Sequence, residues 1–83
     1  MNEFKVKLNS IARVRKFLEI VSVMHEDVDI IVGRYIVDAK SALGIFSIDL
    51  NRVLTVKVHT TDPATCEEFR QKIERFIVDG ESR

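Results

Sequence analysis

Apolar residues recur along this chain with two different periods, and the two periods together restrict what it can fold into. Alternation of apolar and polar side chains, which is typical of half-buried strands, occurs over residues 3–8, 28–32 and 53–60, and a further β-rich run spans residues 35–39. Apolar residues at helical spacing occur over residues 11–25 and 63–77. Because each of these helices is apolar on one side only, both must share one face of a sheet and leave the other face to water.

The pattern also assigns individual side chains to the core. In the first strand Phe4, Val6 and Leu8 point inward, and in the last strand Leu54, Val56 and Val58 do. The apolar stripes of the helices consist of Ile11, Val14, Phe17, Leu18 and Val21, and of Cys66, Phe69, Ile73, Phe76 and Ile77. The outward strand positions are largely polar, which a sheet buried on both faces would not tolerate; they include Lys5, Lys7, Asp29, Thr55 and Lys57.

Residues that favour turns and caps mark the ends of these elements. Gly33-Arg34 between two β-rich runs predicts a tight hairpin, with glycine at the first loop position. Asn9 or Ser10 can cap the first helix, and Asp62-Pro63 opens the last one. A short helical turn is expected over Ser41 to Phe46. The order predicts an α+β open-faced sandwich, in which a four-stranded antiparallel sheet carries two long helices and one short helix on one face.

Length and composition limit the function classes. Eighty-three residues with 46% hydrophobic content describe a single domain spanning 1–83, with loose ends only at the first two residues and at Asp79–Arg83. The formal net charge is zero, so nucleic acid is not an expected partner. No apolar run approaches the roughly 20 residues that cross a bilayer, and the first five residues are too polar to begin a secretory signal. We therefore expect a cytoplasmic protein without a membrane partner.

Few residues offer chemistry of their own. Cys66 lies in the first turn of the last helix, where the helix dipole favours a thiolate, but it also belongs to the apolar stripe, and core packing is the favoured interpretation. His25 and His59 are both expected at the surface. No Ser/His/Asp or Cys/His set stands at a usable spacing, and one cysteine offers no thiol cluster for a metal. We expect no catalytic residues, no metal and no cofactor.

The segment that follows the predicted hairpin carries the most informative motif. Lys40, Ser41, Gly44 and Ser47 form a Lys-Ser-x-x-Gly-x-x-Ser arrangement, which leads from a strand end into the short helix. In this arrangement and in the order of its elements, the chain resembles HPr, the small phosphocarrier of the bacterial sugar phosphotransferase system. The likeness is closest over 27–50 and extends more weakly to the first strand and to the final strand and helix. It implies the HPr-like open-faced fold.

The start of the first helix departs from that family. There the family has Ile/Leu-His-Ala-Arg-Pro, whose histidine accepts the phosphate, and this chain has Ile11-Ala12-Arg13-Val14-Arg15. Neither alanine nor arginine can replace an imidazole as phosphate acceptor. Ile11, Ala12 and Arg13 are thus interpreted as a degenerate phosphocarrier site without carrier activity. Arg13, Arg15 and Lys16 can still be read as an anion site or, preferably, as a solvated basic face.

The resemblance also points to regulation and protein binding. In some members of the family the serine matching Ser41 is phosphorylated by a dedicated kinase, although a simple N-cap would explain Ser41 equally well. The family's partner-binding patch corresponds to Val14, Arg15, Ala42, Leu43 and Phe46, with Ile45 turned inward. A known variant of the family lacks the carrier histidine but keeps the serine, and this chain is similar to it in those two respects.

The chain is therefore expected to be a non-enzymatic, HPr-like protein-binding or regulatory module of the bacterial cytoplasm that takes part in sugar-transport regulation. Expected partners are phosphotransferase-system components, a serine kinase or a transcriptional regulator. Two alternatives remain open. One is a phosphocarrier with a displaced acceptor, His25 or His59. The other is an oligomeric structural module, such as a dimer through an unpaired strand edge, and the oligomeric state is left open.

Overall fold

The computed structural model describes residues 2–78, so Met1 and the expected loose tail Asp79–Arg83 lie outside the described residues. The strands are β1 (Glu3–Val6), β2 (Val28–Val32), β3 (Tyr35–Asp38) and β4 (Leu54–Val58). The helices are α1 (Ile11–Ser22), α2 (Ala42–Phe46) and α3 (Pro63–Lys72), and a 3-10 turn, η1 (Glu74–Phe76), follows α3. Each element lies where the sequence pattern predicts it, with boundaries shifted by a few residues.

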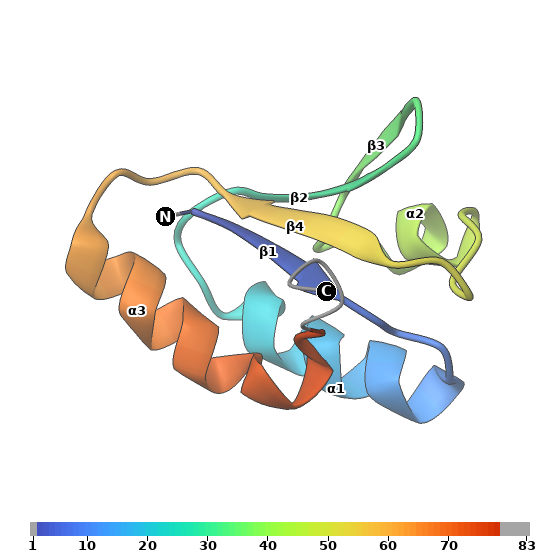
Figure 1. Ribbon diagram of the computed structural model, residues 1–83, viewed down its shortest axis with the longest axis horizontal. Helices are drawn as coiled ribbons and strands as arrows, with labels where there is room; N and C mark the ends of the chain where they lie inside the picture. Colours follow the sequence, from blue (N-terminus) through green and yellow to red (C-terminus); the bar gives the residue numbers. More distant parts are fainter. Residues whose placement is uncertain (1, 79–83) are drawn as a thin grey trace.

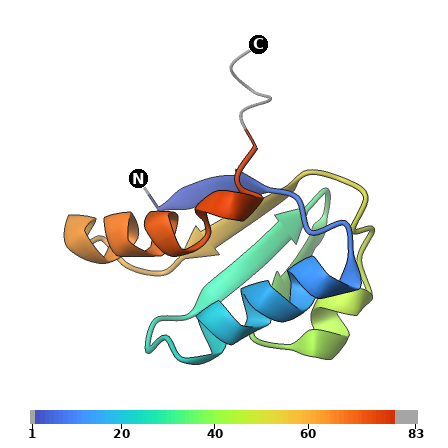
Figure 2. The same cartoon turned by 90° about the horizontal axis from the view of Figure 1, so that it is seen from below.

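The four strands form one antiparallel sheet in the order β1-β4-β2-β3. The two long helices, α1 and α3, lie on one side of this sheet, and the other side carries no helix (Figures 1 and 2). The α+β class and the four-stranded antiparallel sheet are thus confirmed. The hairpin between β2 and β3 turns at Gly33, whose φ of +58° is a backbone conformation that side chains with a Cβ disfavour.

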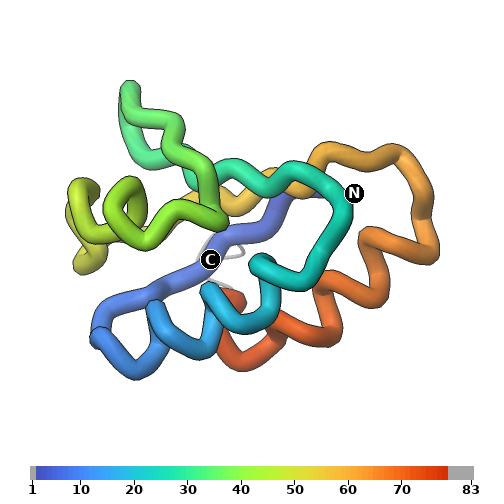
Figure 3. Tube along the Cα trace, turned by 180° about the vertical axis from the view of Figure 1, so that it is seen from behind, coloured from blue at the N-terminus to red at the C-terminus, as the bar shows by residue number. Residues whose placement is uncertain are grey.

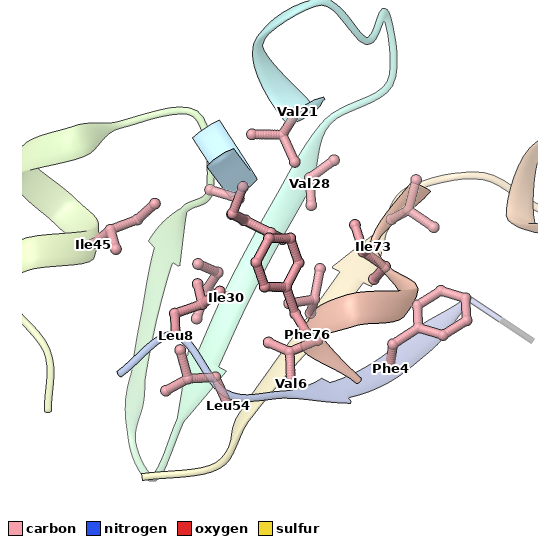
Figure 4. Packing of buried hydrophobic residues seen from close by; sticks show 14 of the residues in the cluster. Phe4, Val6, Leu8, Val21, Val28, Ile30, Ile45, Leu54, Ile73 and Phe76 are labelled. Carbon is pink, nitrogen blue, oxygen red and sulfur yellow. The ribbon is translucent and has the colours of Figure 1, made fainter. Parts of the chain in front are cut away.

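One hydrophobic core fills the space between the sheet and the helices. Figure 4 shows Phe76 of η1 among Val6, Ile30 and Ile73, with Ile45 entering from α2. Val14, Phe17 and Val21 of α1 are buried, as the helical spacing predicts. The prediction for Ile11 is wrong, because this residue is 68% exposed at the first position of the helix.

The last helix begins as predicted and ends earlier than expected. Asp62 caps α3, accepting a hydrogen bond of 2.6 Å from the Thr65 hydroxyl and one of 3.3 Å from the Thr65 N–H. The Thr65 hydroxyl holds the pKa of the Asp62 carboxyl below its usual range. After Lys72 the chain tightens into η1, which still buries Ile73 and Phe76.

The two outer edges of the sheet are covered by the chain itself to different extents. Along β1, Lys7 donates its N–H to the Phe76 carbonyl and Val78 donates to the Lys5 carbonyl, each at 2.9 Å. On the inner side of β1, Asn2 extends the ladder with β4 by bonding to Val58, and it is not a loose residue as expected. At the end of β3 the Ser41 N–H donates to the Asp38 carbonyl at 3.0 Å, but the rest of this terminal strand has no ladder partner on its outer side among residues 2–78. The chain itself therefore covers the β1 edge, and an edge dimer would have to form along β3.

No helix within residues 2–78 combines the length and the apolar character that crossing a membrane requires.

Candidate functional site

The start of α1 is held by a side-chain cap and by one arginine. Ser10 is the N-cap, and its hydroxyl accepts a 3.2 Å hydrogen bond from the Arg13 N–H. The Arg13 guanidinium donates to the carbonyls of Lys7 (3.1 Å) and Arg75 (3.2 Å) and lies 5.2 Å from the centre of the Phe76 ring. Arg13 thus ties the start of α1 to the C-terminal turn. It is half-buried in this role, not on the wet side where the sequence pattern put it.

The neighbours of Arg13 divide between core and surface. Val14 is fully buried, so its assignment to the partner-binding patch is corrected: it packs under the helix and cannot touch a partner. Ala12, Arg15 and Lys16 are exposed and line a shallow hollow together with Glu19. A helix turns its side chains by about 100° per residue, so Arg15 points away from the core that holds Val14.

The Lys-Ser-x-x-Gly-x-x-Ser motif is explained residue by residue by local contacts. Ser41 is the N-cap of α2, and its hydroxyl accepts a 3.1 Å hydrogen bond from the Gly44 N–H. Ser47 closes the same helix, donating its hydroxyl to the Gly44 carbonyl at 2.7 Å. Gly44 lets α2 approach β3 closely, because a Cβ at this position would stand 3.3 Å from the Val37 Cβ.

Lys40, the first residue of the motif, connects α2 to the end of α1. Its ammonium donates a 2.8 Å hydrogen bond to the Met24 carbonyl, just beyond the last turn of α1. Its backbone N–H donates to the Asp38 carboxylate at 2.9 Å. The Lys40 ammonium is therefore engaged by the Met24 carbonyl. The charged group that lies near Ser41 is the Asp38 carboxylate, which accepts the Lys40 N–H.

The outward side of α2 is apolar. Leu43 is 87% exposed and Phe46 is 49% exposed, whereas Ile45 is fully buried, as expected. The helix α2 and the first turns of α1 lie at the same end of the molecule (Figures 1 and 3). We give the name α1–α2 surface to five exposed residues of these two segments: Ile11, Arg15, Ala42, Leu43 and Phe46. Sequence periodicity missed Ile11, since its spacing matches the buried stripe.

The two histidines lie apart from this surface. His59 is exposed at the end of β4, and its Nε2 lies 2.7 Å from the Asp29 carboxylate, so a neighbouring acid occupies that ring nitrogen. His25 is exposed after α1, where it lines a hollow of about 230 Å³ with Glu26 and Glu68. One carboxylate thus lies beside the His59 ring, and the hollow beside His25 is lined by acidic side chains and by the cation of Lys72.

Cys66 packs in the core, where its thiol points toward the Thr60 carbonyl at 4.0 Å. This placement confirms the core interpretation of the cysteine. Among residues 2–78, no three His, Cys, Asp or Glu side chains lie close enough together to hold a metal ion.

No protein-family model matches the chain, and no curated protein matches it.

Proposed function

We propose that this chain is an HPr-like protein-binding or regulatory module, and that it meets its partner through the α1–α2 surface. The observation that carries the proposal is the exposure of Leu43 and Phe46 on a helix whose two flanking serines, Ser41 and Ser47, both hydrogen-bond to Gly44. A helix that is already held in place loses less conformational entropy when a partner buries its side chains. Expected partners are phosphotransferase-system components, a serine kinase or a transcriptional regulator of sugar use in a bacterial cytoplasm.

The absence of an imidazole at the start of α1 supports a module without phosphocarrier activity. The positions that resemble the family's carrier site hold Ile11, Ala12 and Arg13. Arg13 donates to two backbone carbonyls, so its guanidinium is occupied where the family would use it for phosphate. The displaced-acceptor alternative has less support, because His59 is paired with Asp29 and His25 follows the far end of α1, away from the α1–α2 surface.

Ser41 is the proposed regulatory phosphosite. A phosphate on its oxygen would lie at the start of α2, where backbone N–H groups favour negative charge. The same phosphate would stand near Asp38, while Lys40 is held by the Met24 carbonyl. Modification would thus rearrange the turn from Asp38 to Ser41, which positions Leu43 and Phe46. In this proposal the phosphate acts by changing the surface beside it.

Titration of the ¹⁵N-labelled protein with the purified first enzyme of the phosphotransferase system and with the family's serine kinase tests the partner surface. We expect amide shifts at Ile11, Arg15 and the α2 residues, and loss of binding in Leu43→Ser and Phe46→Ser. Val23→Ser is the matched control, since Val23 is an exposed apolar residue, between Phe46 and Leu43 in exposed fraction, that lies at the other end of α1. Binding that is insensitive to both α2 variants would reject this surface.

Incubation with ATP and that serine kinase, followed by intact-mass measurement, tests the phosphosite. One added phosphate in the unmodified sequence and none in Ser41→Ala supports regulation, whereas no reaction leaves Ser41 as a cap only. A parallel incubation with phosphoenolpyruvate and the first enzyme should add no acid-labile phosphate. Its appearance on His25 or His59 would favour the displaced-acceptor alternative.

A further inference from the structure

The face of the sheet that carries no helix is divided into two halves of different character. The strand register aligns its outward residues in rows that cross all four strands. The row toward the β2–β3 hairpin consists of Lys5, Thr55, Ile31 and Ile36. The next row, about 7 Å away along the strands, consists of Glu3, Lys57, Asp29 and Asp38.

The half near the hairpin is apolar at its centre. Ile36 is 65% exposed and lies opposite the half-buried Ile31 in the register. Val53, which is 48% exposed, precedes β4 and points to the same face as Thr55 by alternation. Single exposed apolar residues are common on protein surfaces, but here three of them share one end of one face.

Arginines border these apolar residues. Arg34 belongs to the hairpin turn, and Arg52 reaches that turn from the β4 side, with its Nη1 3.5 Å from the place that a Cβ of Gly33 would take. Within residues 2–78, neither guanidinium has a carboxylate within 4.0 Å. On the β1 side Lys5 adds a third cation, whose ammonium donates to the Thr55 hydroxyl at 2.8 Å.

The other half of the face is acidic. Its row contains Glu3, Asp29 and Asp38 with one lysine, and Asp29 also contacts His59. A long polyanion lying along the strands would therefore leave the basic half and meet carboxylates within one row. A second copy packed on this half about a two-fold axis would bring its own Arg34 and Arg52 toward the same arginines. Both arrangements would place like charges against each other.

We propose that the hairpin half of the open face, formed by Ile31, Arg34, Ile36, Arg52 and Val53, is a second interaction surface and binds a protein segment that presents apolar side chains flanked by carboxylates. The apolar centre supplies buried area, and the unpaired arginines supply the charge complement and the type of side chain that carries much binding energy at interfaces. This surface lies on the opposite side of the sheet from α1 and α3 (Figure 2). It is independent of the α1–α2 surface and of the function proposed for it.

The probe is a synthetic 12-residue peptide with two leucines between aspartates and glutamates. Its control is the same peptide with lysines in place of the acids. With ¹⁵N-labelled protein, the acidic peptide should shift the amides of Ile31, Arg34, Ile36 and Val53, and the effect should weaken as salt is added. The proposal is overturned if the lysine peptide binds equally well, if the shifts fall on the α1–α2 surface, or if nothing binds at millimolar peptide.

Paired variants separate the contributions of apolar contact and charge. Ile36→Ser should weaken peptide binding about tenfold and Arg34→Gln about threefold. The matched controls are Val23→Ser, another exposed apolar residue, and Lys57→Gln, another cation on the same face; neither should weaken binding. Equal losses in the controls would overturn the proposal. So would amide shifts at Ile36 that depend on protein concentration alone, which would indicate a second copy as the occupant.

Discussion

The start of α1 and the segment around α2 use their polar residues differently. Around α2 every residue of the motif has an internal partner, and the outward side chains are apolar. At the start of α1 only Ser10 and Arg13 have internal partners, and the exposed Arg15 and Lys16 have none in the described part of the chain. A sequence motif can therefore be accounted for by the contacts that hold a short helix in place.

This difference shows which residues remain available for function. Those that bond to the backbone around α2 explain why the segment folds as it does. Residues whose side chains point outward, such as Leu43, do not belong to the core. Substitutions that separate inward from outward residues should therefore separate stability from binding.

The largest expected effect is on the inward side of α2. Ile45→Ala leaves a cavity in the core and should lower the free energy of unfolding by about 2–5 kcal/mol. Leu43→Ala, two residues earlier and exposed, should change it by no more than about 0.5 kcal/mol. Urea unfolding measures both. Similar losses in the two variants would mean that Leu43 is also buried in solution.

The next effect concerns the start of α1. Arg13→Gln removes two hydrogen bonds to backbone carbonyls and a contact with Phe76, and should cost about 1–3 kcal/mol of stability. Arg15→Gln is its control and should be within about 0.5 kcal/mol of the unmodified chain. Thermal unfolding by circular dichroism compares them. If Arg13→Gln is as stable as its control, Arg13 is free for another role.

A smaller loss is expected where α2 is joined to the end of α1. Lys40→Met keeps the length of the side chain but removes the hydrogen bond to the Met24 carbonyl, which should cost about 1 kcal/mol. Faster amide exchange in residues 41–46 should accompany the loss, because α2 is then held less firmly to the end of α1. Lys16→Met should show neither effect, and an unchanged exchange pattern in Lys40→Met would contradict the connection.

The smallest expected effect concerns the start of α3, whose N-cap, Asp62, can titrate. The folded-state pKa of Asp62 is lowered, so its contribution to stability is present above the unfolded value of about 3.9 and is lost as the pH falls through the lower folded value. The serine caps of α1 and α2 do not titrate. Acid should therefore weaken the start of α3 first.

Asp62→Asn tests this expectation, because asparagine also caps helices but does not titrate. Urea midpoints at pH 7 and pH 3 should differ less in this variant than in the unmodified chain. Amide shifts at Thr65 should follow the same titration. Identical pH dependence in the two proteins would show that the Asp62 cap is not the acid-sensitive group.

Much of the fold could be predicted because local chemistry specifies it. Gly33 marks the hairpin since few other residues adopt its φ, and Asp62-Pro63 marks the start of α3 through capping. The candidate site was harder to predict. Val14 was assigned both to the core stripe and to the partner patch, and only its packing decides that it is core.

The sequence by itself determined the order of the elements, the inward face of each strand and the single-sided packing of the long helices, because periods of two and 3.6 residues express local geometry. Tertiary structure decided that Arg13 binds the C-terminal turn, that Lys40 bonds to the end of α1 and that Ile11 lies exposed. It also divided the open face into an acidic half and a basic, apolar half. These outcomes depend on residues far apart in the chain, whose distance no local pattern contains.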